Sequence, residues 1–453
     1  MSYTIDNAPL TWRHYFITGV ASLGQLIGTG LATLVSVIIP LYQIVSHSGL
    51  SSVMQGIVGA MDLIGIMVGS TILGKLSDRF GYILFFRLCP LIICVAAIIN
   101  LLFPSLPVMI ICLFFMGFGI GGEYSLDSDY ISELMPIRWK FFMVGAAKAA
   151  SALGNIIVAG ICFLIVKDWT DAALWPRLLW IMIIISGLML LLRIWFWESP
   201  VWLKEHGKIK EAEIDLHHFL GSNVDIETTP LSKGSNVTPS LNESNNFGDF
   251  IKRNWKKIIF TGVPWACEGL GVYGIGVFLP ILVLALGLEH TSPHASPIEN
   301  VASSVEITLW ISCIILPGFI LGLILINKVN LAKLQWVGFL LSAVTLLILL
   351  LAYDNHWAKW ISIVSFMGFE LFLNMGPHLI TYVLPPKVYP VNDRGLGSGI
   401  AASIGKVGAV LGVFFIPILL KWGGSSLVLI VSIIVMALGA LITIVFNPER
   451  NIK

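Results

Sequence analysis

The sequence predicts an all-α membrane protein with twelve transmembrane helices in two six-helix pseudo-repeats and with both termini in the cytoplasm. Of its 453 residues, 57% are hydrophobic and only 12% are charged, and the mean hydropathy is +0.88. Soluble globular proteins do not have such a composition. The apolar residues also gather into runs of about 20 residues, the length at which a helix crosses the hydrocarbon layer.

Twelve such runs follow one another along the chain. Their predicted bounds are 15–40, 52–73, 82–103, 107–132, 142–166, 174–197, 257–286, 303–326, 333–353, 358–383, 396–419 and 425–446. An even number of spans places both termini on the same side of the membrane. If segment 74–81 is cytoplasmic, twenty of the 27 lysines and arginines share its side, whereas Lys167, Arg177, Lys359 and Lys421 lie on the other. The positive-inside rule therefore predicts cytoplasmic termini.

A long polar segment divides the spans into six and six. The predicted parts are an N-terminal bundle (1–197), a cytoplasmic linker (198–255) and a C-terminal bundle (256–453). Residues 200–219 mix apolar and charged positions, which indicates one or two surface helices. Residues 221–248 are rich in Ser, Asn, Thr and Gly, which indicates a flexible linker.

The two halves also share a sequence pattern. Pro136, Lys140, Gly145 and Gly154 in the first half correspond to Pro390, Arg394, Gly399 and Gly408 in the second, and each pair is 254 positions apart. Proline with a basic residue ends one helix and starts the next, and the glycines allow helices to approach closely. A repeated six-helix unit is the simplest explanation of four matches at one offset.

The segment 74–81, Gly-Lys-Leu-Ser-Asp-Arg-Phe-Gly, predicts a tight polar turn between the second and third spans. Two glycines bracket its charges, and such a turn must lie at a membrane surface. The pattern Gly-x-x-x-Asp-Arg-x-Gly resembles the signature loop of the major facilitator superfamily, whose members are twelve-helix secondary transporters. The basic residues that usually continue this signature are replaced here by Tyr82 and Ile83.

Three further motifs resemble the sugar porters and related metabolite:proton symporters of that superfamily. They are Gly-Ile-Gly-Gly-Glu-Tyr at 119–124 followed by Ser-Glu-Leu-Met-Pro at 132–136, Trp-Glu-Ser-Pro-Val-Trp-Leu at 197–203, and Tyr-Pro-Val-Asn-Asp-Arg-Gly at 389–395. The chain departs from this branch in several places. Leu113 replaces its usual arginine, Lys387 replaces a glutamate, the first span has no acid, and the seventh lacks the glutamine pair.

Charged residues inside helices are costly and therefore mark function. The predicted spans place seven of them at or near mid-depth, as candidates for substrate and proton binding: Asp62, Glu123, Asp127, Lys148, Glu268, Glu370 and Lys406. Aromatic and amide candidates add Gln25, Tyr124, Asn155, Trp265, Tyr273, Asn374 and His378.

Glu123 is the preferred proton site. It follows Gly121 and Gly122, whose missing side chains are expected to leave space around it. A buried carboxyl is neutral when protonated and charged when released, as coupling requires. Asp127 lies four residues on and shares its face, and mutual neutralisation with Lys148 is an alternative role for that acid. Lys148 or Lys406 is expected to stabilise the charged form of Glu123.

Residues near the predicted cytoplasmic surface are interpreted as gating residues. They are Gly74, Asp78, Arg79, Gly81, Glu133, Arg138, Lys140, Lys387 and Arg394. The resemblance implies that Asp78 caps a helix of the second half and pairs with a base near Arg138 or Lys140 in the outward-open state.

These features predict a secondary active transporter rather than an enzyme. No Gly-x-x-x-x-Gly-Lys-Ser/Thr motif for ATP is present, so an ion or solute gradient must supply the energy. We expect no cofactor, no metal site and no nucleic-acid partner, and we interpret the six cysteines as buried free thiols. The expected protein is a monomer in the plasma (inner) membrane.

Three functional hypotheses follow from the sequence. The first is proton-coupled symport of a small polar organic metabolite such as a sugar, a polyol or an organic acid. The second is export or uniport by the same fold, including transport of organic cations. The third is a membrane sensor that has lost transport.

The orientation is tested by cysteine labelling from outside the cell. A cysteine introduced at Ser232, in the predicted cytoplasmic linker, should resist an impermeant thiol reagent, and one introduced at Ser292 should react. The reverse labelling pattern would contradict the predicted orientation.

Overall fold

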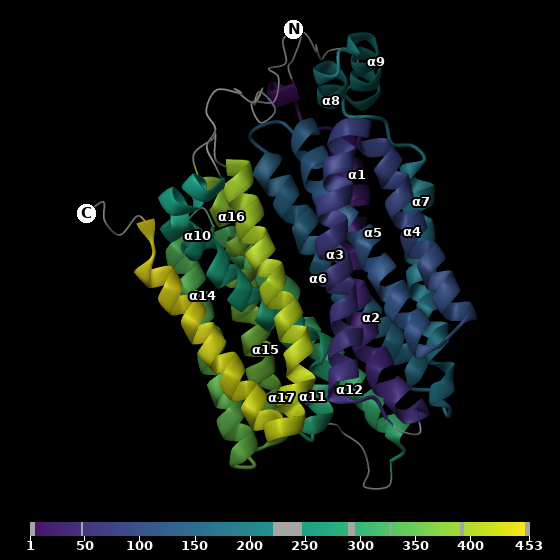
Figure 1. Ribbon diagram of the computed structural model, residues 1–453, viewed down its shortest axis with the longest axis vertical. Helices are drawn as coiled ribbons and strands as arrows, with labels where there is room; N and C mark the ends of the chain where they lie inside the picture. The colour runs from purple at the N-terminus through teal and green to yellow at the C-terminus, as the bar shows by residue number, and fades with distance from the viewer. Residues whose placement is uncertain are drawn as a thin grey trace. The chain divides into compact units, whose positions relative to one another are not determined.

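A computed structural model describes residues 5–46, 49–220, 247–288, 295–326, 328–389 and 394–448, and all regular elements in these ranges are helices (Figure 1). The chain divides into two compact units. The first comprises Met1–Leu31, Ile64–Gly154 and Leu179–Asn242, and the second comprises Ala32–Leu63, Asn155–Leu178 and Glu243–Lys453. The division at a linker predicted from the sequence stays a prediction.

The first half of the chain contains nine α-helices and a 3₁₀ segment within the described residues. These are α1 (Trp12–Ala21), α2 (Leu23–Val45), α3 (Ser52–Phe80), α4 (Tyr82–Leu102), α5 (Leu106–Leu134), α6 (Lys140–Val166), η2 (Ala172–Leu179), α7 (Trp180–Arg193), α8 (Pro200–Glu205) and α9 (Ile209–Leu220). A further 3₁₀ turn covers Ile5–Asn7. Helices α2, α3 and α6 each contribute residues to both units.

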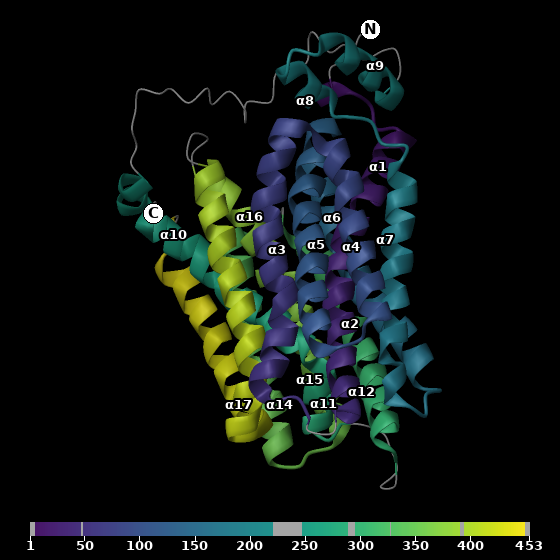
Figure 2. The same cartoon turned by 45° about the vertical axis from the view of Figure 1, so that its right-hand side comes forward.

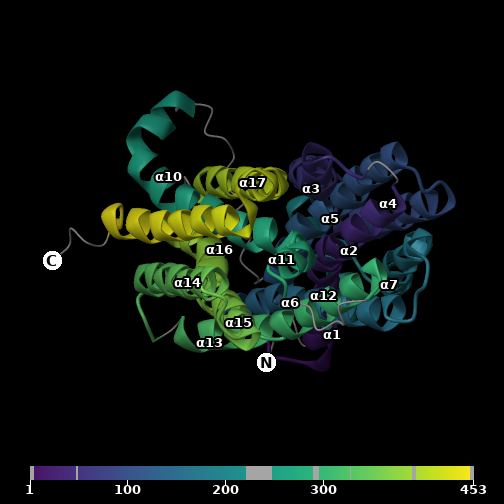
Figure 3. The same cartoon turned by 90° about the horizontal axis from the view of Figure 1, so that it is seen from below.

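The second half contributes the remaining helices of the second unit. These are α10 (Phe247–Gly269), a π-helical turn η3 (Leu270–Ile275), α11 (Leu279–Ala285), α12 (Pro297–Ser312), α13 (Ile315–Leu325), α14 (Leu331–Asp354), α15 (Lys359–Met375), α16 (Pro377–Val388) and α17 (Arg394–Val445). Figure 3 shows α17 beside α10 and α14, and α17 makes extensive contacts with each of them.

The predicted membrane segments are confirmed. Within the described residues, eleven helical stretches are long and apolar enough to cross a membrane. The last of these covers Gly399–Val445 and is broken at Gly423 and Gly424, whose backbone is not helical. It therefore contains two segments, which correspond to the predicted spans 396–419 and 425–446.

Two predicted boundaries were wrong. Helix α10 begins at Phe247, so the last part of the predicted linker is helical. The segment 74–81 is not a turn, because α3 continues to Phe80 and only Gly81, with φ +91°, leaves the helix. A polar sequence can extend a membrane helix beyond the hydrocarbon, since its backbone hydrogen bonds are satisfied within the helix.

Glycine pairs let helix backbones touch in the same way in both halves. On α3, a Cβ at Gly65 or Gly69 would overlap the carbonyl oxygens of Phe114 and Phe118 on α5. On α13, a Cβ at Gly318 would lie 2.8 Å from the carbonyl oxygen of Leu371 on α15, and one at Gly322 would lie 2.5 Å from that of Met375. Small residues four positions apart permit this close approach.

The sequence repeat has a direct structural counterpart. A Cβ at Gly154 of α6 would overlap the backbone of Leu26 on α2, and a Cβ at Gly408 of α17 would overlap the backbone of Ala266 on α10. The two glycines are 254 positions apart, and each packs against the first membrane helix of its own half. The repeat therefore preserves a helix contact.

The short helices α8 and α9 pack against the ends of the first unit's membrane helices (Figure 2). Their buried side chains, Val201, Trp202, Leu203, Ala212, Leu216 and Phe219, form one core with residues of the other helices. The predicted surface helices are thus present. The predicted flexible linker lies almost wholly outside the described residues.

Glycine packing gives a stability prediction. Gly69→Ala should destabilise the protein by about 1–3 kcal/mol, because the added methyl overlaps the α5 backbone. Gly187 of α7 is the matched control, since nothing lies within 4 Å of its Cβ position. Gly187→Ala should be neutral or stabilising because alanine favours helix. Thermal unfolding in detergent measures both variants, and equal losses would contradict the packing argument.

Candidate transport site

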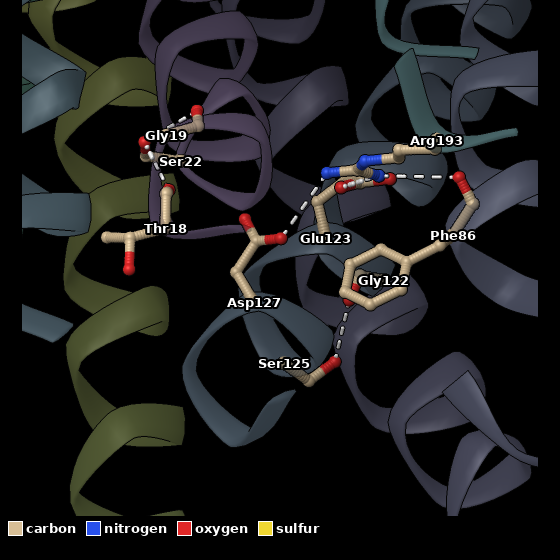
Figure 4. Close-up of polar contacts among 9 residues, drawn as sticks. All are labelled: Thr18, Gly19, Ser22, Phe86, Gly122, Glu123, Ser125, Asp127 and Arg193. Carbon is tan, nitrogen blue, oxygen red and sulfur yellow. Dashed lines mark hydrogen bonds and ion pairs between the residues drawn. The ribbon is translucent and has the colours of Figure 1, made fainter. Parts of the chain in front are cut away.

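The first unit buries an ion cluster formed by Glu123 and Asp127 of α5 and Arg193 of α7 (Figure 4). Arg193 Nη1 lies 2.5 Å from Glu123 Oε2, and Arg193 Nη2 lies 3.4 Å from Asp127 Oδ1. The side chains of Arg193 and Glu123 are fully buried. The guanidinium also lies 4.6 Å from the Phe86 ring centroid and donates to the Phe86 carbonyl.

Glycine placement explains why the two carboxylates fit. Glu123 and Asp127 lie one turn apart on α5, so both reach the same guanidinium. A Cβ at Gly24 of α2 would overlap Asp127 and lie 2.9 Å from Glu123 Oε2. The expectation that Gly121 and Gly122 open space around Glu123 was wrong, because these glycines pack tightly against α3 and α4.

A hydrogen-bonded chain extends the cluster. Gln25 of α2 interacts with Asp127, and its Oε1 lies 3.4 Å from Lys148 Nζ. Lys148 of α6 also lies 5.4 Å from the ring centroid of Tyr124. Four predicted candidates from three helices therefore meet Arg193 and Glu123 in one polar group.

Arg193 is the functional residue that sequence reasoning missed. It lies in the predicted span 174–197 but is not among the candidates named from the sequence. Arg193 forms ion pairs with both acids. The sequence had offered Lys148 as an alternative partner for Asp127, and Lys148 or Lys406 as the expected partner of Glu123. The only available signal was an arginine in an otherwise apolar run.

The second unit contains a second buried polar pair. His378 Nδ1, at the start of α16, lies 2.5 Å from Glu268 Oε1, near the end of α10. The His378 ring also packs edge-on against Phe319, with ring centroids 5.2 Å apart. Lys406 of α17 interacts electrostatically with Glu268 and lies 4.9 Å from the Tyr273 ring centroid.

The remaining candidates lie in the same unit. Glu370 of α15 accepts a hydrogen bond from Asn374 Nδ2 at 3.1 Å, one turn along that helix. The Trp265 ring packs where Gly405 has no side chain. Asn155 accepts a hydrogen bond from the Thr33 hydroxyl at 2.8 Å. Asp62 of α3 is buried and interacts electrostatically with Lys406.

Glu198, in the segment between α7 and α8, caps the N-terminus of α4. Its carboxylate accepts the backbone N–H groups of Tyr82 at 2.8 Å and Ile83 at 3.1 Å. A side chain at Gly81 would collide with this carboxylate. The cap satisfies otherwise unpaired N–H groups and complements the helix dipole.

Glu133, a predicted gating residue, joins the same network. It accepts the Tyr82 hydroxyl at 2.9 Å and the Ser199 hydroxyl. Asp215 of α9 accepts the backbone N–H of Glu198, and burial raises the pKa of the Asp215 carboxyl. Helices α4, α5, α8 and α9 are thereby linked at one end of the first unit.

The other gating residues are less closely tied. Gly74 lets α3 approach Ser125. Arg79 and Arg138 are exposed and lie over the rings of Phe80 and Trp139. Lys140 begins α6, and Lys387 is exposed in the last turn of α16. The side chains of Asp78 and Arg394 lie outside the described residues, so their gating roles stay predictions.

The Arg193 cluster yields a stability prediction. Arg193→Gln should destabilise the protein by about 3–5 kcal/mol, because two buried carboxylates lose their counter-charge. The loss should be greater at alkaline than at mildly acidic pH, since protonation relieves the uncompensated charge. Thermal unfolding at several pH values measures this.

Arg87→Gln is the control, because Arg87 is exposed and its side chain donates to the Ile194 carbonyl. Its effect should stay within about 0.5 kcal/mol. A pH-independent loss in Arg193→Gln, or one no larger than that of the control, would contradict the ion cluster.

Known proteins resemble this chain over nearly its whole length. The family model described as "Sugar (and other) transporter" matches residues 21–453. The Escherichia coli inner membrane metabolite transport protein YgcS is 25% identical, with 89% of this chain and 84% of that protein covered. The Arabidopsis thaliana probable inorganic phosphate transporter 1-6 is also 25% identical, with 99% and 94% covered.

The fold is similar to that of the xylose transporter XylE from E. coli, with a TM-score of 0.77 and 20% identity over 97% of this chain and 98% of that one. Another structure describes XylE as a proton:xylose symporter of the major facilitator superfamily. This chain therefore belongs to the sugar (and other) transporter family, and it is a multi-pass membrane transporter rather than an enzyme.

Proposed function

We propose that this protein is a proton-coupled symporter that takes up a small polar organic metabolite, such as a sugar, a polyol or an organic acid, by alternating access. It acts as a monomer in the plasma (inner) membrane with both termini in the cytoplasm. The family establishes transport, and the E. coli relative named an inner membrane protein supports the location.

The observation that carries proton coupling is the Arg193 cluster. It sets two carboxylates against one guanidinium, all of them buried, so a fully ionised cluster leaves an excess negative charge away from water. Oε1 of Glu123 also has no hydrogen-bond partner among the described residues. A proton on Glu123 neutralises the excess, and the known cost of burying unpaired charge supplies the driving force.

The balance of buried charge in the described membrane helices supports this assignment. The buried ionisable groups there include five carboxylates, those of Asp62, Glu123, Asp127, Glu268 and Glu370, but Arg193 is the one buried lysine or arginine. Lys148 and Lys406 are only partly buried. Acids in excess bind protons or cations, which favours proton coupling over an uncoupled uniporter.

The same excess favours a second candidate, transport of an organic cation that pairs directly with these acids. The two functions differ in their response to a pH gradient. A symporter accumulates its substrate when the outside is acidic, whereas a cation uniporter responds to membrane potential instead.

Glu123→Gln tests the proton site in proteoliposomes. Because a gradient of one pH unit corresponds to 1.36 kcal/mol for each proton, wild-type protein should concentrate substrate up to about tenfold. The variant should lose this accumulation yet keep exchange at equal concentrations, since glutamine mimics the protonated carboxyl. Labelled D-xylose, mannitol, malate, inorganic phosphate and tetraethylammonium are the probes.

Asp168→Asn serves as the control because Asp168 is exposed at the end of α6. It should accumulate substrate like wild type. If Glu123→Gln still accumulates substrate under a pH gradient, Glu123 is not the proton site. If wild-type protein takes up tetraethylammonium in response to membrane potential alone, the symporter hypothesis is wrong and the protein is an organic-cation carrier.

A further inference from the structure

One face of α3 packs closely on α17 within the second unit. A Cβ at Gly56 would lie 2.5 Å from the carbonyl oxygen of Phe414, and one at Gly59 would lie 2.9 Å from Val413 Cγ1. The residue numbers of the contacting positions rise along α3 and fall along α17, so the two helices run antiparallel through this contact. Their backbones approach too closely there for intervening side chains.

Asp62 continues this face of α3. It follows Gly59 by three residues and Gly56 by six, which is about 9 Å along the helix. On α17, Lys406 precedes Phe414 by eight residues, or about 12 Å. The register of the contact therefore places Asp62 and Lys406 within about 3–6 Å of each other along the helix axes, a gap that a lysine side chain can span, and the two groups interact electrostatically.

Only one of the two Asp62 carboxyl oxygens has a hydrogen-bond partner among the described residues. Asp62 is 1% exposed, and its Oδ1 accepts the backbone N–H of Leu63 at 2.7 Å. Its Oδ2 is buried with no hydrogen-bond partner among the described residues. A buried carboxylate oxygen without a donor is costly, whereas a protonated carboxyl carries no charge.

Lys406 is not dedicated to Asp62. It also faces Glu268, and its Nζ lies over the Tyr273 ring. Glu268 has a second partner in His378. Among the charged groups that the structure describes, Lys406 is the one that acts electrostatically on Asp62. One lysine cannot neutralise both carboxylates at once.

We propose that Asp62 is a second proton-binding site, in which a proton and the Lys406 ammonium alternate as the partner of the carboxyl at the α3–α17 contact. The site is separate from the Arg193 cluster and does not depend on the proposed role of Glu123. Binding of the proton neutralises the Asp62 carboxyl and leaves Lys406 to pair with Glu268, so the net charge of these three groups rises from −1 to 0.

Infrared difference spectra of the purified protein, recorded during a pH titration, test the site without any substrate. Wild type should show a protonated-carboxyl band that is lost on raising the pH. Asp62→Asn should remove this band, and Glu123→Gln should keep it. In Lys406→Gln the band should persist to a pH about one unit higher or more, because an opposite charge no longer favours the carboxylate.

Asp168→Asn is the surface control and should leave the band unchanged. If Asp62→Asn does not fold, Asp62→Glu replaces it and should shift the frequency of the same band. An unaltered titrating spectrum in the Asp62 variants would overturn the site, since Asp62 would then be a permanent ion pair. An unchanged midpoint in Lys406→Gln would overturn the alternation with Lys406.

Discussion

The burial of charge without water is the constraint on which this structure depends. Hydrocarbon offers no hydrogen bonds, so each ionised group in a membrane helix needs a partner from the protein. Arg193 forms ion pairs with Glu123 and Asp127, and these ion pairs join α7 to α5. Gly24 lets α2 close over the same carboxylates, and Gln25 then links them to Lys148 of α6. Four helices therefore meet at one polar cluster.

Glycines supply the second requirement, which is close contact between helix backbones. Lipid gives little hydrophobic drive for helices to associate, so van der Waals contact between backbones matters more than in water. The pairs Gly65 with Gly69 and Gly318 with Gly322 place α3 on α5 and α13 on α15 by the same four-residue spacing. The same spacing therefore brings one pair of helices into close contact in each half of the chain.

The end of the first unit that carries α8 and α9 couples separate helices through Glu198. The Glu198 carboxylate caps α4, and the Glu198 backbone N–H donates a hydrogen bond to Asp215. The hydroxyl of the neighbouring Ser199 donates a hydrogen bond to Glu133 of α5. These contacts link α8 and α9 to the N-terminus of α4 and to α5. Gly81 and Glu133, which lie at these contacts, were interpreted as gating residues from the sequence, and those roles stay predictions.

The sequence by itself determined the fold class, the membrane segments, the repeat and most members of the polar clusters, because apolar run length and the cost of intramembrane charge are local properties. It could not determine partners. Arg193 pairs with residues 66 and 70 positions away, and Glu268 pairs with His378 at a separation of 110. It also mistook the end of α3 for a turn, since polarity is compatible with either conformation. Only tertiary structure decided these points, because helix register and rotation set which buried charges meet, and packing rather than composition fixes both.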